Sequence, residues 1–189
     1  MINLEKNPAA SVGLTEQEAV NAVFNKYIQY KRFADVCHTV RHLMEEDLHI
    51  SSDFWCLGGS WSMIGHGIDI DREPHDVDVI LDLRLWETFK YLLKLRPDIK
   101  IINHVDASDY ARLTIQYNGY HIDILCANDP KHFDEVYTGI MSCRIESLDH
   151  IIEVKSKWQR PKDQEDIRLI KKWWNDLQTA LEEKDDLPF

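Results

Sequence analysis

The chain has 189 residues, of which 44% are hydrophobic and 29% charged, and its formal net charge is −11. These values fit one globular domain of ordinary size and exclude fibrous and intrinsically disordered proteins. No apolar run approaches the ~20 residues that span a bilayer, and the N-terminus has no signal-peptide pattern, so we expect a cytoplasmic protein without a membrane partner. The negative charge argues against a protein that coats nucleic acid through a general basic surface. The four cysteines form no CxxC pair, which makes a zinc-ribbon or redox motif a weak interpretation.

The first 50 residues have helical patterns. One amphipathic pattern runs through residues 20–28, and a second runs from about Phe33 to Leu48. We therefore expect a helical N-terminal segment over residues 1–50. It precedes a core over residues 51–146 and a helical C-terminal segment, residues 147–189, that packs on the core.

The centre of the chain has strand patterns. Short apolar runs at 53–57, 77–81 and 99–105 predict strands, and 85–95 predicts a helix that stops before Pro97. Asn118-Gly119 separates two β-rich runs, 111–117 and 120–126, and predicts a hairpin because a type I′ turn needs positive φ at both central residues. Two helices, roughly 148–158 and 163–183, close the chain. The expected fold class is α/β (α+β), a small mixed sheet flanked by helices.

Asp76-Val77-Asp78 opens one of the predicted strands. Side chains at i and i+2 of a strand point to the same face, ~6.6 Å apart along the strand, so two carboxylates can lean onto one cation. Alone, this pattern is more often a solvated strand edge. Asp123 lies in another predicted strand between Ile122 and Ile124, and alone it would be a solvent-facing residue of a hairpin.

Gly58-Gly59-Ser60 directly follows the first predicted strand. Two glycines let the backbone turn sharply and approach a ligand closely, and a helix that starts there presents free N–H groups to an anion. Ser60 would then be an N-cap or a hydroxyl donor to a phosphate oxygen. Alone, such a pattern is usually a plain tight turn.

The three features occur together and in order along the chain. Three carboxylates on one sheet face repel one another unless cations are present. Two Mg²⁺ ions would neutralise Asp76, Asp78 and Asp123 and bridge a nucleoside triphosphate (NTP), which explains how an acidic protein binds an acidic ligand.

The run Leu57-Gly-Gly-Ser60, then Pro74-His-Asp-Val-Asp-Val-Ile80, then His121-Ile-Asp-Ile124 resembles the DNA polymerase β-type nucleotidyltransferase superfamily. The resemblance covers residues 53–126. It implies a nucleotidyltransferase-type sheet, a site that binds ATP or another NTP, and transfer of a nucleoside monophosphate from that NTP to a hydroxyl with release of pyrophosphate.

Carried over by position, the resemblance assigns roles to single residues. Asp76 and Asp78 would bind both metals, and Asp123 would bind the catalytic metal and help to deprotonate the acceptor hydroxyl. Gly58, Gly59 and Ser60 would hold the β- and γ-phosphates. The long spacer between Ser60 and Asp76 is similar to the lincosamide- and aminoglycoside-modifying branch.

The C-terminal stretch also resembles these families. It has Lys155 on one predicted helix, then Arg160-Pro-Lys-Asp163 and Asp166. Lys155 either contacts the nucleotide phosphates or only pairs with the two acids. Arg160 and Lys162 are the next phosphate candidates.

Several functions stay open. The expected acceptor is a small molecule such as an antibiotic or metabolite, and a toxin-like enzyme that acts on tRNA or protein is the alternative. An Asp-x-Asp glycosyltransferase would release a nucleoside diphosphate instead of pyrophosphate, and a non-catalytic nucleotide-binding module would release neither. The acceptor, the preferred NTP and the oligomeric state do not follow from the sequence.

Overall fold

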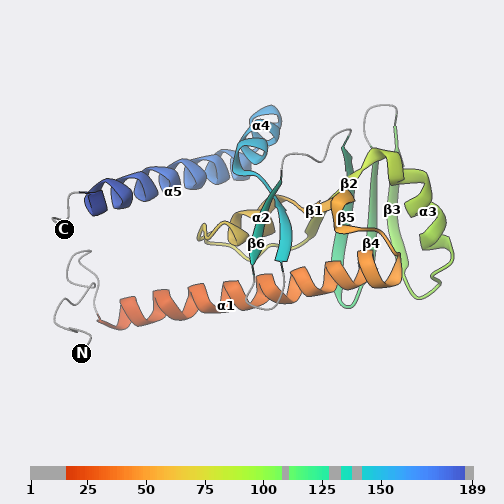
Figure 1. Ribbon diagram of the computed structural model, residues 1–189, viewed down its shortest axis with the longest axis horizontal. Coiled ribbons are helices and arrows are strands. Elements are labelled where there is room, and N and C mark those ends of the chain that lie inside the picture. The colour runs from red at the N-terminus through yellow and green to blue at the C-terminus, as the bar shows by residue number, and fades with distance from the viewer. Residues whose placement is uncertain (1–15, 108–110, 128–132, 138–141, 186–189) are drawn as a thin grey trace.

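The computed structural model describes residues 16–107, 111–127, 133–137 and 142–185. Figure 1 shows the long helix α1 along one side of the molecule and α4 and α5 along the opposite side, with α2 and the sheet between them. The helices are α1 (Glu16–Arg41), α2 (Gly59–Gly65), α3 (Trp86–Lys94), α4 (Leu148–Trp158) and α5 (Pro161–Asp185). The strands are β1 (Trp55–Leu57), β2 (Val77–Asp82), β3 (Lys100–Asp106), β4 (Ala111–Tyr117), β5 (Tyr120–Ala127), β6 (Phe133–Tyr137) and β7 (Ser142–Glu146).

The seven strands form one mixed sheet in the order β3-β4-β5-β2-β1-β7-β6. The pairs β2–β5 and β1–β7 are parallel, whereas β1–β2, β3–β4, β4–β5 and β6–β7 are antiparallel. The expected mixed sheet flanked by helices is therefore confirmed. Its centre, β5-β2-β1, carries the sequence features that predict the site.

One continuous core lies between the sheet and the helices. Phe33, Val36 and Val40 of α1 are buried in the same cluster as Val79 of β2 and Ile124 of β5. The alternation of buried and half-buried residues along β4 shows that one sheet face packs on this core. The opposite face is more polar, and Asp78 and Asp123 point to it because they alternate with the core residues Val79 and Ile124.

The predicted hairpin is confirmed. Asn118 and Gly119 have φ of 47° and 84°, the positive values that a two-residue turn needs at both central positions. The turn joins β4 and β5 in the register Tyr117–Tyr120 to Arg112–Leu125. The register places Asp123 opposite Thr114, which determines the surroundings of this carboxylate.

One expectation about secondary structure is wrong, and one pair of strands was not predicted. The two N-terminal helical patterns form a single helix, α1, which continues into a short π-helix at His42–Asp47, because no glycine or proline interrupts residues 29–32. The hairpin β6–β7 was not expected from the sequence. Its strands are only five residues long, yet β7 pairs with β1 and brings Glu146 beside the glycine turn.

Within the described part of the chain, no helix is both long enough and apolar enough to cross a membrane.

Candidate active site

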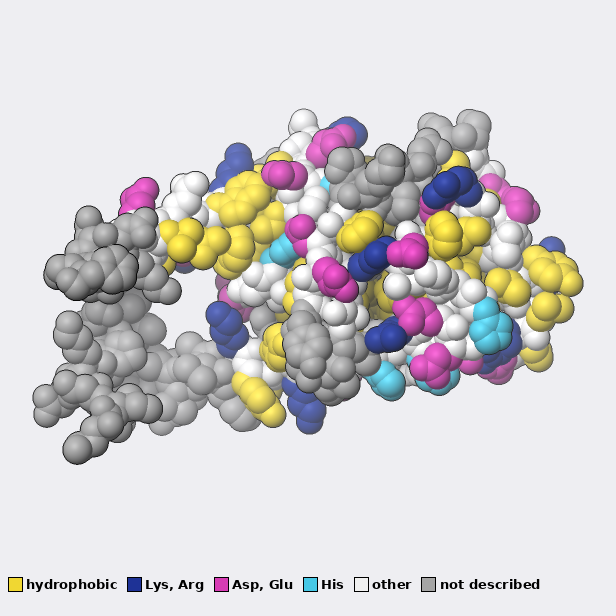
Figure 2. Space-filling view, viewed as in Figure 1, with side chains coloured by type: hydrophobic (Ala, Val, Ile, Leu, Met, Phe, Trp, Pro, Cys, Tyr) yellow, Lys and Arg dark blue, Asp and Glu magenta, His cyan; other side chains and the backbone are white. Residues whose placement is uncertain are grey.

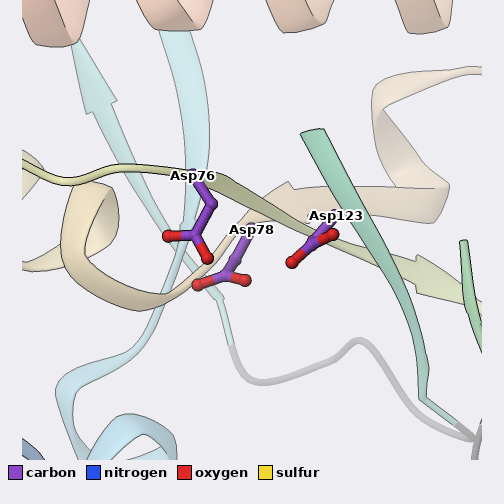
Figure 3. Close-up of side chains that lie close together, drawn as sticks. All are labelled: Asp76, Asp78 and Asp123. Carbon is purple, nitrogen blue, oxygen red and sulfur yellow. The ribbon is translucent and has the colours of Figure 1, made fainter. Parts of the chain in front are cut away.

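Asp76, Asp78 and Asp123, here called the carboxylate triad, come together at the centre of the sheet. One oxygen from each lies within 4.8 Å of the others, a separation that a shared metal ion can bridge. Asp78 of β2 and Asp123 of β5 are register partners in parallel strands, and Asp76 immediately precedes β2 (Figure 3). The three predicted acids therefore do meet at one point.

Burial and like charges strongly perturb Asp78. The pKa of Asp78 is raised to about 7. Burial away from water is the largest cause, repulsion from Asp76, Asp123 and Glu146 adds to it, and the charge of Lys155 opposes it. A carboxyl group in this state gains from a nearby cation. The electrostatics of the triad thus favour binding of a divalent metal ion, and its oxygen donors are those that Mg²⁺ prefers.

Asp123 is held in place by two side chains of β4. Thr114 Oγ1 donates a hydrogen bond to Asp123 Oδ1 at 2.5 Å, and the guanidinium of Arg112 forms an ion pair with Oδ2. Only 3% of Asp123 is exposed. The hairpin register therefore sets the orientation of this carboxylate before any ligand arrives.

The glycine turn (Gly58-Gly59-Ser60) lies directly against the triad. Gly58 N donates to the carbonyl oxygen of Asp78 at 2.8 Å, and Gly59 has a φ of +58°. A Cβ atom on Gly59 would lie 2.2 Å from Asp78 Oδ2. Only glycine allows both this backbone conformation and this close approach.

Ser60 is half-buried and lies beside the most basic part of the site. Arg72 Nη2 donates to Ser60 Oγ at 3.0 Å and to Asp166 Oδ2 at 2.8 Å. Lys155 Nζ donates to the same Asp166 oxygen at 2.7 Å. The distance from Lys155 Nζ to Asp163 Oδ1 is 3.6 Å. Asp166 thus joins two cations, and one of them touches the glycine turn.

Arg160 forms an ion pair with Asp163. Its guanidinium contacts Asp163 with Nε–Oδ2 and Nη2–Oδ1 distances of 2.7 and 3.1 Å. The hydrogen bond to Asp163 is the main cause that raises the pKa of Arg160, and the charges of Asp78 and Asp76 raise it further. Arg160 is exposed and within electrostatic range of the triad, whereas Asp163 is fully buried.

Two neighbouring cavities lie between α1 and the segment before β2, and Asp76 lines the smaller one. One, of about 250 Å³, is lined by Asp76, His75, Tyr120 and His121, and the other, of about 430 Å³, extends toward α1. They share four lining residues: Arg32, Trp61, Glu73 and Pro74. An Arg32–Glu73 ion pair of 2.7 Å joins α1 to the segment before β2 there. Together the cavities have the size of a small-molecule pocket.

Sequence reasoning missed four residues around the site. Arg72, Arg112 and Thr114 contact Ser60 or Asp123, and Glu146 contacts Gly59. Arg112 and Thr114 alternate along the predicted strand 111–117. The predicted hairpin pairs this strand with 120–126, which carries Asp123, so their positions were a usable signal. Glu146 reaches Gly59 from 87 positions along the chain and Arg72 reaches Ser60 from 12 positions away, and nothing in their local sequence indicates either contact.

Comparison with solved structures identifies the fold. The crystal structure of ANT(2″)-Ia in complex with adenylyl-2″-tobramycin has a TM-score of 0.50 and 14% identity, covering 76% of this chain and 94% of that chain. The chain has the nucleotidyltransferase fold.

Two further structures were found in the same comparison. The lincosamide antibiotic adenylyltransferase LnuA, with lincomycin bound, has a TM-score of 0.44 and 20% identity, covering 62% of this chain and 85% of that chain. The solution structure of the antibiotic-resistance factor ANT(2″)-Ia has a TM-score of 0.47 and 14% identity, covering 78% and 97%. No protein-family model and no curated protein matches the sequence.

Proposed function

We propose that this protein is a metal-dependent nucleotidyltransferase that transfers a nucleoside monophosphate from an NTP to a hydroxyl group of a small molecule. The observation that carries the proposal is the carboxylate triad, whose oxygens lie within 4.8 Å of one another beside a turn that only glycine can form. The fold shared with ANT(2″)-Ia, which binds adenylyl-2″-tobramycin, supports the same class of reaction.

The triad is the place for two Mg²⁺ ions. When bound, such ions neutralise charge on the phosphates and on the attacking oxygen. Asp76 and Asp78 would hold both ions, and Asp123 would hold the one nearer the acceptor. The raised pKa of Asp78 shows that its charge is not balanced by the protein alone, and this supports a cation as the missing partner.

The glycine turn and its basic neighbours would hold the triphosphate. Because Ser60 Oγ accepts a hydrogen bond from Arg72, its own proton is directed elsewhere and suits a phosphate oxygen. Arg72 and Lys155 pair with Asp166, and Lys155 and Arg160 pair with Asp163, so three positive charges face two negative ones and this corner has a positive excess for an anion. The phosphates are thereby held by fixed charges in addition to metal.

The reaction itself exchanges one bond for another. The acceptor oxygen forms a bond to the α-phosphorus, and the bond from that phosphorus to the oxygen bridging to the β-phosphate breaks. The electron pair leaves with pyrophosphate, and the hydroxyl proton passes to the Asp123 carboxylate. Thr114 and Arg112 hold that carboxylate toward the triad, so the proton acceptor is oriented in advance.

The acceptor would lie in these two cavities. Their residues include Trp61, Pro74 and Tyr120, which offer apolar and aromatic surface to a ring, and the smaller cavity adjoins the triad through Asp76. Figure 2 shows acidic and basic side chains interspersed over the face in view, and the net charge is −11. This distribution favours a small acceptor over tRNA, whose backbone binds to continuous basic surface.

A labelling experiment tests the proposal. The protein is incubated with Mg²⁺ and each α-³²P-labelled NTP, with hydroxyl-bearing antibiotics, tRNA and proteins as separate acceptors. We expect label on a small molecule, pyrophosphate as the other product, and no transfer by Asp76→Ala or Asp78→Ala. Label on tRNA or protein would select the toxin-like alternative. In a parallel incubation with nucleotide sugars in place of NTPs, release of a nucleoside diphosphate would indicate a glycosyltransferase. Near-normal transfer by either variant would contradict the metal assignment.

A further inference from the structure

Glu146, the last residue of β7, is a buried carboxylate without an assigned task. Only 5% of it is exposed, although its charge is close enough to repel that of Asp78. Burying a charge is costly unless hydrogen bonds compensate for it. The contacts of Glu146 therefore show which part of the structure depends on it.

The side chain of Glu146 joins the glycine turn to α4. Oε2 accepts a hydrogen bond from Gly59 N at 3.0 Å, and Oε1 lies 2.7 Å from Nδ1 of His150. A Cβ atom on Gly58 would lie 3.1 Å from Oε2, so the carboxylate is packed against the turn. Both carboxylate oxygens are thus engaged.

The backbone of Glu146 is fixed as firmly as its side chain. Its carbonyl oxygen accepts a hydrogen bond from Ser62 Oγ at 2.6 Å, and Nε2 of His66 lies 2.9 Å from the same oxygen. Both residues belong to or directly follow α2, which begins at Gly59. Glu146 is therefore locked to α2 at two points.

This arrangement replaces an ordinary helix cap. Gly58 occupies the N-cap position of α2 and has no side chain with which to satisfy the first free N–H groups. Glu146 supplies the missing acceptor from a distant strand. Its hydrogen bond holds Gly59 at a positive φ and against Asp78.

We propose that Glu146 is a positioning residue that sets the distance between the glycine turn and the carboxylate triad, and thereby the affinity for the NTP. The inference rests on the proposed function. Glu146 contacts neither nucleotide nor metal in this account. It acts through Gly59, whose place decides whether Ser60 and the triad can hold one triphosphate together.

The test measures binding of the α,β-methylene analogues of the four NTPs with Mg²⁺ by isothermal titration calorimetry. Glu146→Ala removes the hydrogen bond to Gly59, and Glu146→Asp keeps the charge but is too short to reach it. We expect both variants to bind the best analogue about tenfold more weakly or worse, the loss expected for one hydrogen bond to a charged group. Glu146→Gln keeps an acceptor for Gly59 N and should stay within about threefold of wild type.

Asp82→Ala is the matched control. Asp82 is also a fully buried, hydrogen-bonded carboxylate, but it lies at the other end of β2 and pairs with Arg84. It should lower the melting temperature without weakening analogue binding. If Glu146→Ala and Glu146→Asp are folded and bind the analogue like wild type, the inference about Glu146 is wrong but the proposed function stands. The same holds if Asp82→Ala or Glu146→Gln weakens analogue binding as much as Glu146→Ala does. If wild type bound none of the analogues, the proposed function would fail with it.

Discussion

Asp78 and Asp123 face each other as register partners in the parallel strands β2 and β5. In a parallel pair, partnered residues point to the same sheet face, so the pairing alone brings the two carboxylates together. Asp76, just before β2, completes the triad. The site thus follows from one strand pairing. The first prediction comes from the repulsion among the three carboxylates of the triad.

Replacing Asp78 by Asn should stabilise the metal-free protein and abolish transfer. A carboxyl group whose pKa is raised in the folded state binds its proton more tightly there, so stability rises as pH falls through about 7. Wild type should therefore gain about 1 kcal/mol in unfolding free energy between pH 8 and pH 6, and Asp78→Asn should lack that gain. Urea unfolding in EDTA at both pH values measures it. An equal pH dependence in the variant would show that another group is responsible.

Gly59→Ala should abolish transfer, because the new methyl group would lie 2.2 Å from Asp78 Oδ2 and the backbone has positive φ. Gly67→Ala is the matched control. Gly67 also has positive φ, at +85°, but among the residues that the structure describes its Cβ would meet nothing nearer than Trp173 Nε1 at 4.0 Å. Each variant should lose about 1 kcal/mol of stability to backbone strain. Only Gly59→Ala should lose NTP transfer, and a loss in both would mean that strain alone matters.

Lys155→Ala should weaken both NTP binding and stability. Asp166 is fully buried, and loss of one of its two cations leaves Arg72 alone to balance it. We expect a loss of about 3 kcal/mol in unfolding free energy, the lower end for a broken buried pair. Lys157→Ala, which breaks an exposed pair with Glu153 on the same helix, should change neither quantity. A stability loss with unchanged NTP affinity would assign Lys155 to ion pairing only.

Glu146→Gln should lower the pKa of His150. The hydrogen bond that Nδ1 of His150 donates to Glu146 is the largest cause that raises this pKa, and Glu153 adds only a smaller Coulombic contribution. Because the folded-state pKa is raised, the pair stabilises the protein below the ordinary His pKa, and this contribution is lost as pH rises through the folded value. NMR titration of the His150 ring gives the pKa directly. Glu153→Gln should lower it less, and the reverse order would contradict the Glu146–His150 contact.

The sequence indicated the chemistry of the site better than its support. The triad, the glycine turn and the Asn118-Gly119 hairpin are local patterns, and the structure brings them together as expected. Arg72 was missed because it reaches Ser60 only when Asp166, 94 positions away, holds it there, and Glu146 was missed because Gly59 is 87 positions away. The strand β7 that carries Glu146 has too few residues to show a clear period.

The most direct test of the metal site is a Mn²⁺ titration followed by electron paramagnetic resonance, in the presence of the best-bound α,β-methylene NTP analogue. It needs no knowledge of the acceptor. We expect wild type to bind Mn²⁺ with the analogue, and Asp78→Ala and Asp123→Ala, both still folded, to lose this binding. Mn²⁺ bound equally by wild type and the two variants would show that the three carboxylates do not form the metal site.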